Sequence, residues 1–65
     1  MSTDEIFWII GGHSRKGHPV FFRSIEIAYY YNKYELGNTN PELLLEVAVD
    51  AEYIEELIEL GNIIG

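Results

Sequence analysis

The apolar residues of this chain form short runs in its first third and more widely spaced patterns after that. Residues 5–10 read EIFWII, a continuous run of strand-forming residues that ends at a Gly-Gly pair. A second run, PVFFR at residues 19–23, follows after a loop that contains three glycines. Bounded apolar runs of this length are typical of strands, so we predict a hairpin with a long loop.

The next segment carries helix signals at both ends. Ser24 can cap a helix N-terminus with its side-chain oxygen, and Gly37 stands where a left-handed residue ends a helix. We therefore predict a helix over residues 25–36. At about 100° per residue its apolar side chains form two stripes. One stripe contains Ile25, Ala28, Tyr29 and Leu36, and the opposite stripe contains Ile27, Tyr30, Tyr31 and Tyr34.

Two interpretations of residues 41–60 stay open. Asn40, Pro41 and Glu42 form a strong helix start, and the apolar residues that follow keep helical spacing, which allows one long helix. In the alternative, LLLEVAV at residues 43–49 is a strand, and Asp50 caps a separate helix over residues 51–60. We favour the second interpretation, because both halves of the chain then contain a strand, a cap residue and a helix that ends in ELGN.

The favoured fold is an α+β sandwich of ββαβα order, with room for a short last strand at NII; the alternative is a β-hairpin followed by two helices. Residues 1–65 form a single small acidic domain, whose stability we expect to be only a few kcal/mol. The chain has no cysteine, which excludes a disulfide and a thiolate zinc site. Residues 1–10 are typical neither of a signal peptide nor of a membrane span, so we expect a cytoplasmic protein.

Charge is distributed unevenly along the chain. The formal net charge is −7, yet all four cations lie between residues 15 and 33. From residue 34 onward there are eight acidic residues and neither lysine nor arginine. Such a block of one sign is typical of an interaction surface.

The last predicted helix concentrates this negative charge. Its glutamates fall within an arc of about 100°; they are Glu52, Glu55, Glu56 and Glu59, with Ala51, Ile54, Leu57 and Ile58 on the opposite side. A glutamate run is commonly only the solvated face of an amphipathic helix. Without compensating cations, however, it can also imitate nucleic-acid phosphates toward a basic groove. We take these four glutamates as candidate partner-binding residues, with Tyr30, Tyr31 and Tyr34 as candidate apolar anchors.

The loop between the first two strands collects hydrogen-bond donors. As a candidate anion-binding loop it contains His13, Ser14, Arg15, Lys16 and His18. Its glycine spacing matches neither a P-loop nor a dinucleotide fingerprint. Two histidines alone do not predict a metal site, and Ser14 lacks the orienting group and dry pocket that a nucleophile requires. We therefore predict no catalytic residue, no metal and no cofactor.

These features favour a small acidic, non-enzymatic protein-binding module. We expect an inhibitor or modulator that blocks the basic surface of a partner such as a nucleic-acid-binding enzyme. In composition the chain resembles the inhibitors that bacteriophages make against host enzymes and defence systems, which are short, acidic and rich in aromatics. Two alternatives stay open: a homo-oligomeric structural or regulatory subunit that buries the tyrosines, and a phosphate- or nucleotide-binding module that uses the loop. We expect no direct binding to nucleic acid, because the net charge repels phosphates, and no membrane association.

Overall fold

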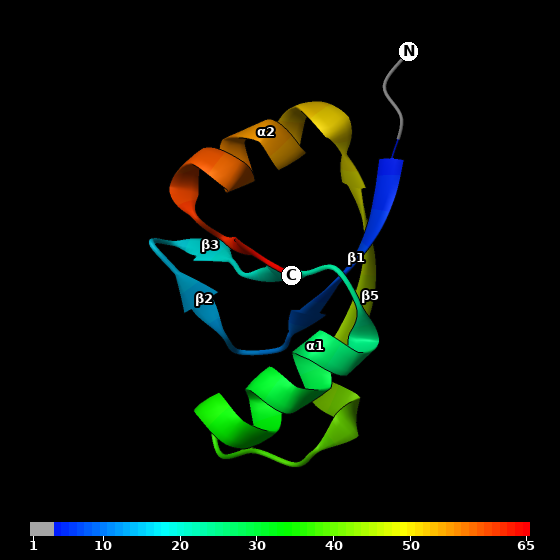
Figure 1. Cartoon of the computed structure of the whole chain (residues 1–65), viewed down its shortest axis with the longest axis vertical. Coiled ribbons are helices and arrows are strands. Elements are labelled where there is room, and N and C mark those ends of the chain that lie inside the picture. The colour runs from blue at the N-terminus through cyan, green and yellow to red at the C-terminus, as the bar shows by residue number, and fades with distance from the viewer. Residues whose placement is uncertain (1–3) are drawn as a thin grey trace.

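In the computed structural model, which describes residues 4–65, a four-stranded sheet lies between two helices (Figure 1). The elements in chain order are β1 (Asp4–Ile10), β2 (Ser14–Arg15), β3 (His18–Pro19), β4 (Phe21–Phe22), α1 (Ile25–Tyr30), the π-helix η1 (Tyr31–Glu35), the 3-10 helix η2 (Pro41–Leu43), β5 (Leu44–Asp50), α2 (Ala51–Leu60) and β6 (Ile63–Ile64). Residues 1–3, which begin the acidic N-terminal segment, lie outside the described residues. The α+β class predicted from the sequence is confirmed.

The order of strands in the sheet is β5-β1-β4-β6. β1 pairs with β5 in antiparallel register over seven residues, from Asp4 opposite Asp50 to Ile10 opposite Leu44. β4 is antiparallel to β1 and parallel to the short β6. Residues 44–50 are therefore a strand, as the favoured interpretation predicted, and the single long helix over residues 41–60 is wrong.

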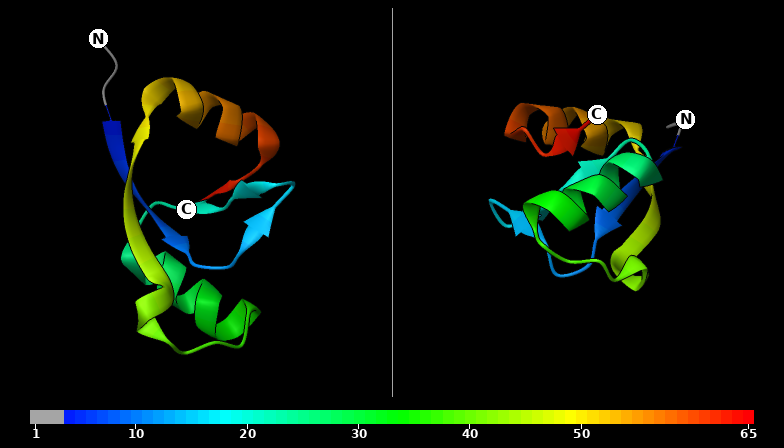
Figure 2. Two further views of the ribbon diagram at one scale, coloured as in Figure 1. Left: turned by 180° about the vertical axis from the view of Figure 1, so that it is seen from behind. Right: turned by 60° about the horizontal axis from the view of Figure 1, so that its bottom comes forward.

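The ribbon views in Figure 2 show α1 and α2 on opposite sides of the sheet. Alternation along β1 supplies one core cluster on each face. Phe7 faces α2 and belongs to a buried cluster with Phe21, Val49, Ile54 and Leu57. Ile10 belongs to the cluster on the α1 side, which contains Val20, Phe22 and Ala28. Because successive side chains of a strand point to opposite faces, the run EIFWII supplies apolar residues to both layers. This explains why apolar and polar residues do not alternate in this run.

The first helix begins as predicted, with the Ser24 hydroxyl accepting a hydrogen bond from the Ile27 backbone N–H at 3.2 Å. It then widens, because the Leu36 N–H donates to the Tyr31 carbonyl five residues earlier at 3.2 Å. The predicted stripe of Ile25, Ala28, Tyr29 and Leu36 is not a core face, since only Ala28 of this set is buried. The helix instead packs on the sheet through Ala28 with Ile27 and Tyr31 beside it.

Candidate functional site

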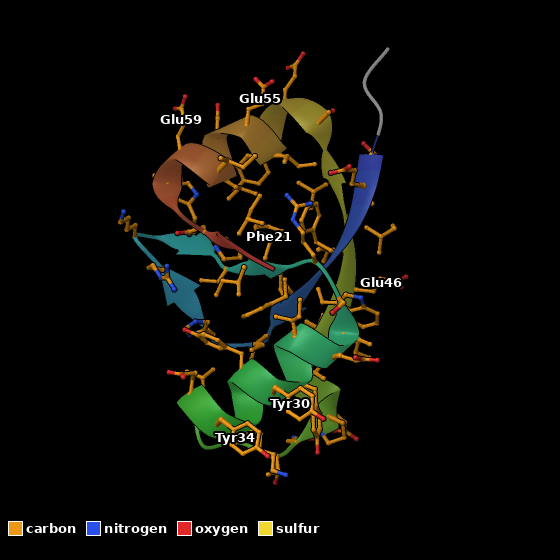
Figure 3. All side chains as sticks on the ribbon, viewed as in Figure 1. Phe21, Tyr30, Tyr34, Glu46, Glu55 and Glu59 are labelled. Atoms are coloured by element: carbon orange, nitrogen blue, oxygen red, sulfur yellow. The ribbon has the colours of Figure 1, made fainter. Side chains whose placement is uncertain are left out.

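The outer side of α2 carries the four glutamates that the sequence singled out, and we call it the α2 acidic surface: Glu52, Glu55, Glu56 and Glu59, all exposed. Glu55 and Glu59 point away from the rest of the molecule in Figure 3. Ile58, which the sequence pattern placed on the apolar side, is 56% exposed and flanks this surface. On a helical wheel Ile58 lies about 60° from Glu55 and at the margin of the buried face. This marginal position is the sequence signal from which its exposure could have been predicted.

Two of the four cations bind the C-terminal end of α2 and not its acidic surface. The Arg15 guanidinium donates to the Gly61 carbonyl at 3.0 Å, and the Lys16 ammonium donates to the Leu60 carbonyl at 3.1 Å. Carbonyls at a helix C-terminus lack helical partners and carry the negative end of the helix dipole. The two cations therefore cap α2 and do not pair with its glutamates.

The other two cations lie on aromatic rings. The Arg23 guanidinium carbon is 5.5 Å from the centre of the Phe7 ring, and the Lys33 nitrogen is 5.2 Å from the centre of the Tyr34 ring. All four cations of the chain thus have partners other than the α2 acidic surface. Within residues 4–65, no hydrogen bond or ion pair joins the side chains of that surface to a cation.

The candidate anion-binding loop is a small β-ribbon, in which β2 pairs with β3. Lys16 and Gly17 form its two-residue turn with φ of 55° and 79°, the left-handed pair of a type I′ hairpin. Asn62 anchors the ribbon to the segment that follows the end of α2. Its side-chain amide donates to the Arg15 carbonyl at 3.0 Å and to the His18 carbonyl at 3.3 Å. Ser14 is exposed on the ribbon. Sequence reasoning missed the role of Asn62, for which the repeated ELGN was the available signal.

The two histidines of this loop are turned toward tyrosines. The His13 ring lies 5.4 Å from the Tyr31 ring, and His18 Nδ1 is 3.4 Å from the Tyr53 hydroxyl. Among the residues that the structure describes, no group of three histidine or carboxylate side chains could hold a metal ion.

The structure separates the candidate tyrosine anchors from one another. Tyr31 packs on Phe22, with ring centres 5.0 Å apart, and forms part of the core layer under α1. Tyr30 and Tyr34 are 55% and 68% exposed, and their rings stack at 5.8 Å. In Figure 3 these two rings lie at the opposite end of the molecule from Glu55 and Glu59. The tyrosines and the α2 acidic surface therefore do not form one continuous contact.

Comparison with protein-family models, with curated proteins and with solved structures gives no significant match for this chain. No helix of residues 4–65 is long and apolar enough to cross a membrane.

Proposed function

We propose that this protein is a non-enzymatic binding module that uses the α2 acidic surface to occupy a basic, nucleic-acid-binding surface of a partner protein. It would act as an inhibitor or modulator by blocking the access of nucleic acid. The observation that supports this proposal is a set of four exposed carboxylates on α2. The four cations of the chain contact backbone carbonyls or aromatic rings and not these carboxylates. Like charges at this spacing repel one another, and a basic partner relieves that repulsion.

The carboxylates distribute negative charge along most of α2. Glu59 lies seven positions after Glu52, which corresponds to about 10.5 Å along the helix axis. Glu55 and Glu56 lie between them on the same side of the helix. A strip of four carboxylates on one helix face complements a groove that is lined with cations.

The α2 acidic surface is held rigidly from the inside. Ile54 and Leu57 anchor α2 to the sheet, and Leu57 is fully buried. The Asp50 carboxylate accepts a hydrogen bond from the Glu52 N–H at 2.8 Å, which caps the first turn. A preorganised helix loses less conformational entropy on binding than a flexible acidic segment, and this favours affinity.

A displacement experiment tests the proposal. Proteins of a cell lysate are retained on immobilised DNA and eluted with this protein at low salt. We expect release of a specific nucleic-acid-binding protein. The α2 variant, with Glu→Gln at positions 52, 55, 56 and 59, should release none of it. The control variant has Glu→Gln at positions 5, 26, 42 and 46, which are also exposed, and it loses the same four charges. Release by the control variant, but not by the α2 variant, assigns binding to α2; equal release by both contradicts the proposal.

A second candidate function is self-association, which the free edge of the sheet favours. β5 is seven residues long and pairs only with β1 in the described sheet. Leu45 on this strand and Ile6 on its neighbour are 47% and 55% exposed. Edge strands with exposed apolar residues readily pair with a second chain. Sedimentation velocity across a wide concentration range distinguishes the candidates, because a monomer at every concentration eliminates the self-associating subunit.

A further inference from the structure

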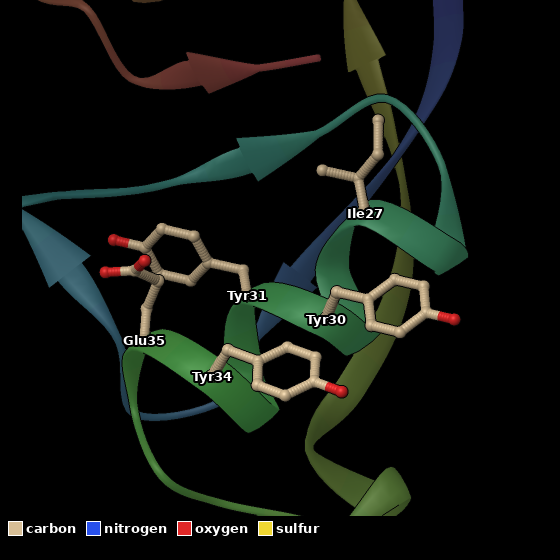
Figure 4. Close-up of a pocket in the computed structure, with 5 residues that line it drawn as sticks. All are labelled: Ile27, Tyr30, Tyr31, Tyr34 and Glu35. Carbon is tan, nitrogen blue, oxygen red and sulfur yellow. The ribbon is translucent and has the colours of Figure 1, made fainter.

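A shallow groove on the outer side of α1 and η1 forms a second surface, separate from α2. Its volume is about 410 Å³, and Figure 4 shows the residues that line it: Ile27, Tyr30, Tyr31, Tyr34 and Glu35. Three of the five are tyrosines and one is a carboxylate. The lining therefore combines aromatic ring faces with a negative charge.

The exposed rings of Tyr30 and Tyr34 form a platform. Their planes differ by only 11°, with ring centres 5.8 Å apart. Figure 4 shows the two hydroxyl groups on the same side of the groove and the Glu35 carboxylate beside the Tyr31 ring. Because Tyr31 is fixed by its contact with Phe22, it forms a firm inner wall. The groove thus has a flat aromatic side and an acidic corner.

The backbone under the groove is a π turn, not the α-helix that the sequence pattern predicted. This turn covers Tyr31–Glu35, which includes three of the five lining residues. Its far end is fastened by the Asn38 N–H, which donates to the Asn32 carbonyl at 2.9 Å. Isolated π turns are rare and occur frequently at functional sites.

The chemistry of the lining selects a cation. The face of a tyrosine ring attracts positive charge, and the Glu35 carboxylate adds a formal negative charge. The Tyr34 ring already has a cation beside it, since the Lys33 nitrogen lies 5.2 Å from the ring centre. An arginine of a partner has to displace this exposed lysine. A planar guanidinium fits better than an ammonium, since it can stack flat on near-parallel rings and donate two hydrogen bonds to one carboxylate.

From this geometry we infer that the groove binds an arginine side chain of a partner protein. The guanidinium stacks on the platform at the Tyr34 ring, which lies nearer than Tyr30 to Glu35 in Figure 4, and pairs with Glu35. This inference is independent of the α2 acidic surface, which lies at the other end of the molecule. Aromatic platforms also stack nucleobases, but here Glu35 and the net charge of −7 oppose the phosphates of a nucleic acid.

The test is an NMR titration of the full chain with the tripeptide acetyl-Gly-Arg-Gly-amide. We expect saturable binding in the millimolar range, with chemical-shift changes centred on residues 27–36. The citrulline peptide, which keeps the shape and removes the charge, should bind at least tenfold more weakly, and the lysine peptide severalfold more weakly. Changes centred on α2, equal binding of the citrulline peptide, or tighter binding of oligothymidylate at the groove would each overturn the inference.

Matched variants locate the site. Tyr34→Leu and Glu35→Gln should each weaken binding of the arginine peptide by about fivefold, since each removes one contact to the cation. Ile25→Ala and Glu26→Gln serve as controls, because both residues are exposed on α1 and neither lines the groove. Unchanged affinity in the first pair, or equal losses in both pairs, contradicts the inference. Far-UV circular dichroism of all four variants verifies that they remain folded.

Discussion

Truncation of Asn62 tests how the basic ribbon is held against the end of α2. The Asn62 side chain is fully buried, and its amide nitrogen lies 3.0 Å from the Arg15 carbonyl and 3.3 Å from those of His18 and Pro19. A side-chain amide carries two N–H donors, so it satisfies two of these three carbonyls at a time. Asn62→Ala keeps the backbone N–H that closes the end of α2 and removes only this side-chain link.

The expected loss in the free energy of unfolding is about 2–3 kcal/mol. Each buried polar group left without a partner costs about 1–3 kcal/mol. Two carbonyls lose their donor. The loss is reduced because water reaches the exposed Arg15 and because the substitution also removes the buried Asn62 Oδ1, which has no hydrogen-bond partner. A domain of this size rarely has more than about 3–5 kcal/mol of stability. Asn62→Ala should therefore remove most of the stability of the fold.

Asn38 provides a matched control, because it occupies the same position in the other ELGN segment. Its side-chain oxygen accepts a hydrogen bond from the Asn40 N–H at 2.9 Å in an exposed turn. Asn38→Ala should cost only about 0.5–1 kcal/mol, because water replaces the lost acceptor. Urea denaturation followed by the fluorescence of Trp8 measures both variants. Equal losses in the two variants would refute the role assigned to Asn62.

Other substitutions test the turn, the packing of α2 and its cap. Gly17→Ala should destabilise the fold by about 1 kcal/mol in thermal unfolding, because its φ of 79° disfavours a side chain; an unchanged midpoint argues against the I′ turn. In urea denaturation, Leu57→Ala should lower the free energy of unfolding by about 3 kcal/mol and Ile58→Ala by less than about 0.5 kcal/mol, since only Leu57 is buried. The reverse order would mean that α2 packs through another face. Arg15→Gln and Lys16→Gln should each lower the free energy of unfolding by about 0.5 kcal/mol. A loss of stability that does not shrink in 0.5 M NaCl contradicts capping by charge.

Local sequence signals predicted the elements of this fold well. The favoured split at Asp50 is correct because the alternation in residues 43–49 and the cap residue describe interactions between near neighbours. The register of β5 on β1 was not predicted, since it depends on pairing between residues up to 46 positions apart. The ribbon within the first loop was also missed, because its turn uses Lys16 in a left-handed conformation that few residues other than glycine adopt.

The candidate sites were predicted in part. The exposure of the glutamates followed from helical periodicity alone. The position of Tyr30 and Tyr34, at the other end of the molecule from these glutamates, did not follow from helical periodicity. The helical wheel assumed α-helical geometry for residues that form a π turn. It also does not indicate which end of the sheet each helix covers. Arg15 is a candidate donor of the anion-binding loop, and its guanidinium donates to a carbonyl 46 residues away, a contact that the sequence does not indicate. Only the tertiary fold brings these groups together.

The most direct test of the proposed function uses the protein that is released from DNA in the displacement experiment. Its affinity for the two glutamate variants is measured by calorimetry at one salt concentration. The α2 variant and the control variant lose the same charge, so long-range attraction weakens equally in both. If the α2 acidic surface makes the contact, the control variant binds within severalfold of the unmodified protein and the α2 variant loses about 100-fold, or close to 3 kcal/mol. Similar affinities for the two variants would show that position on α2 does not matter and would contradict the account.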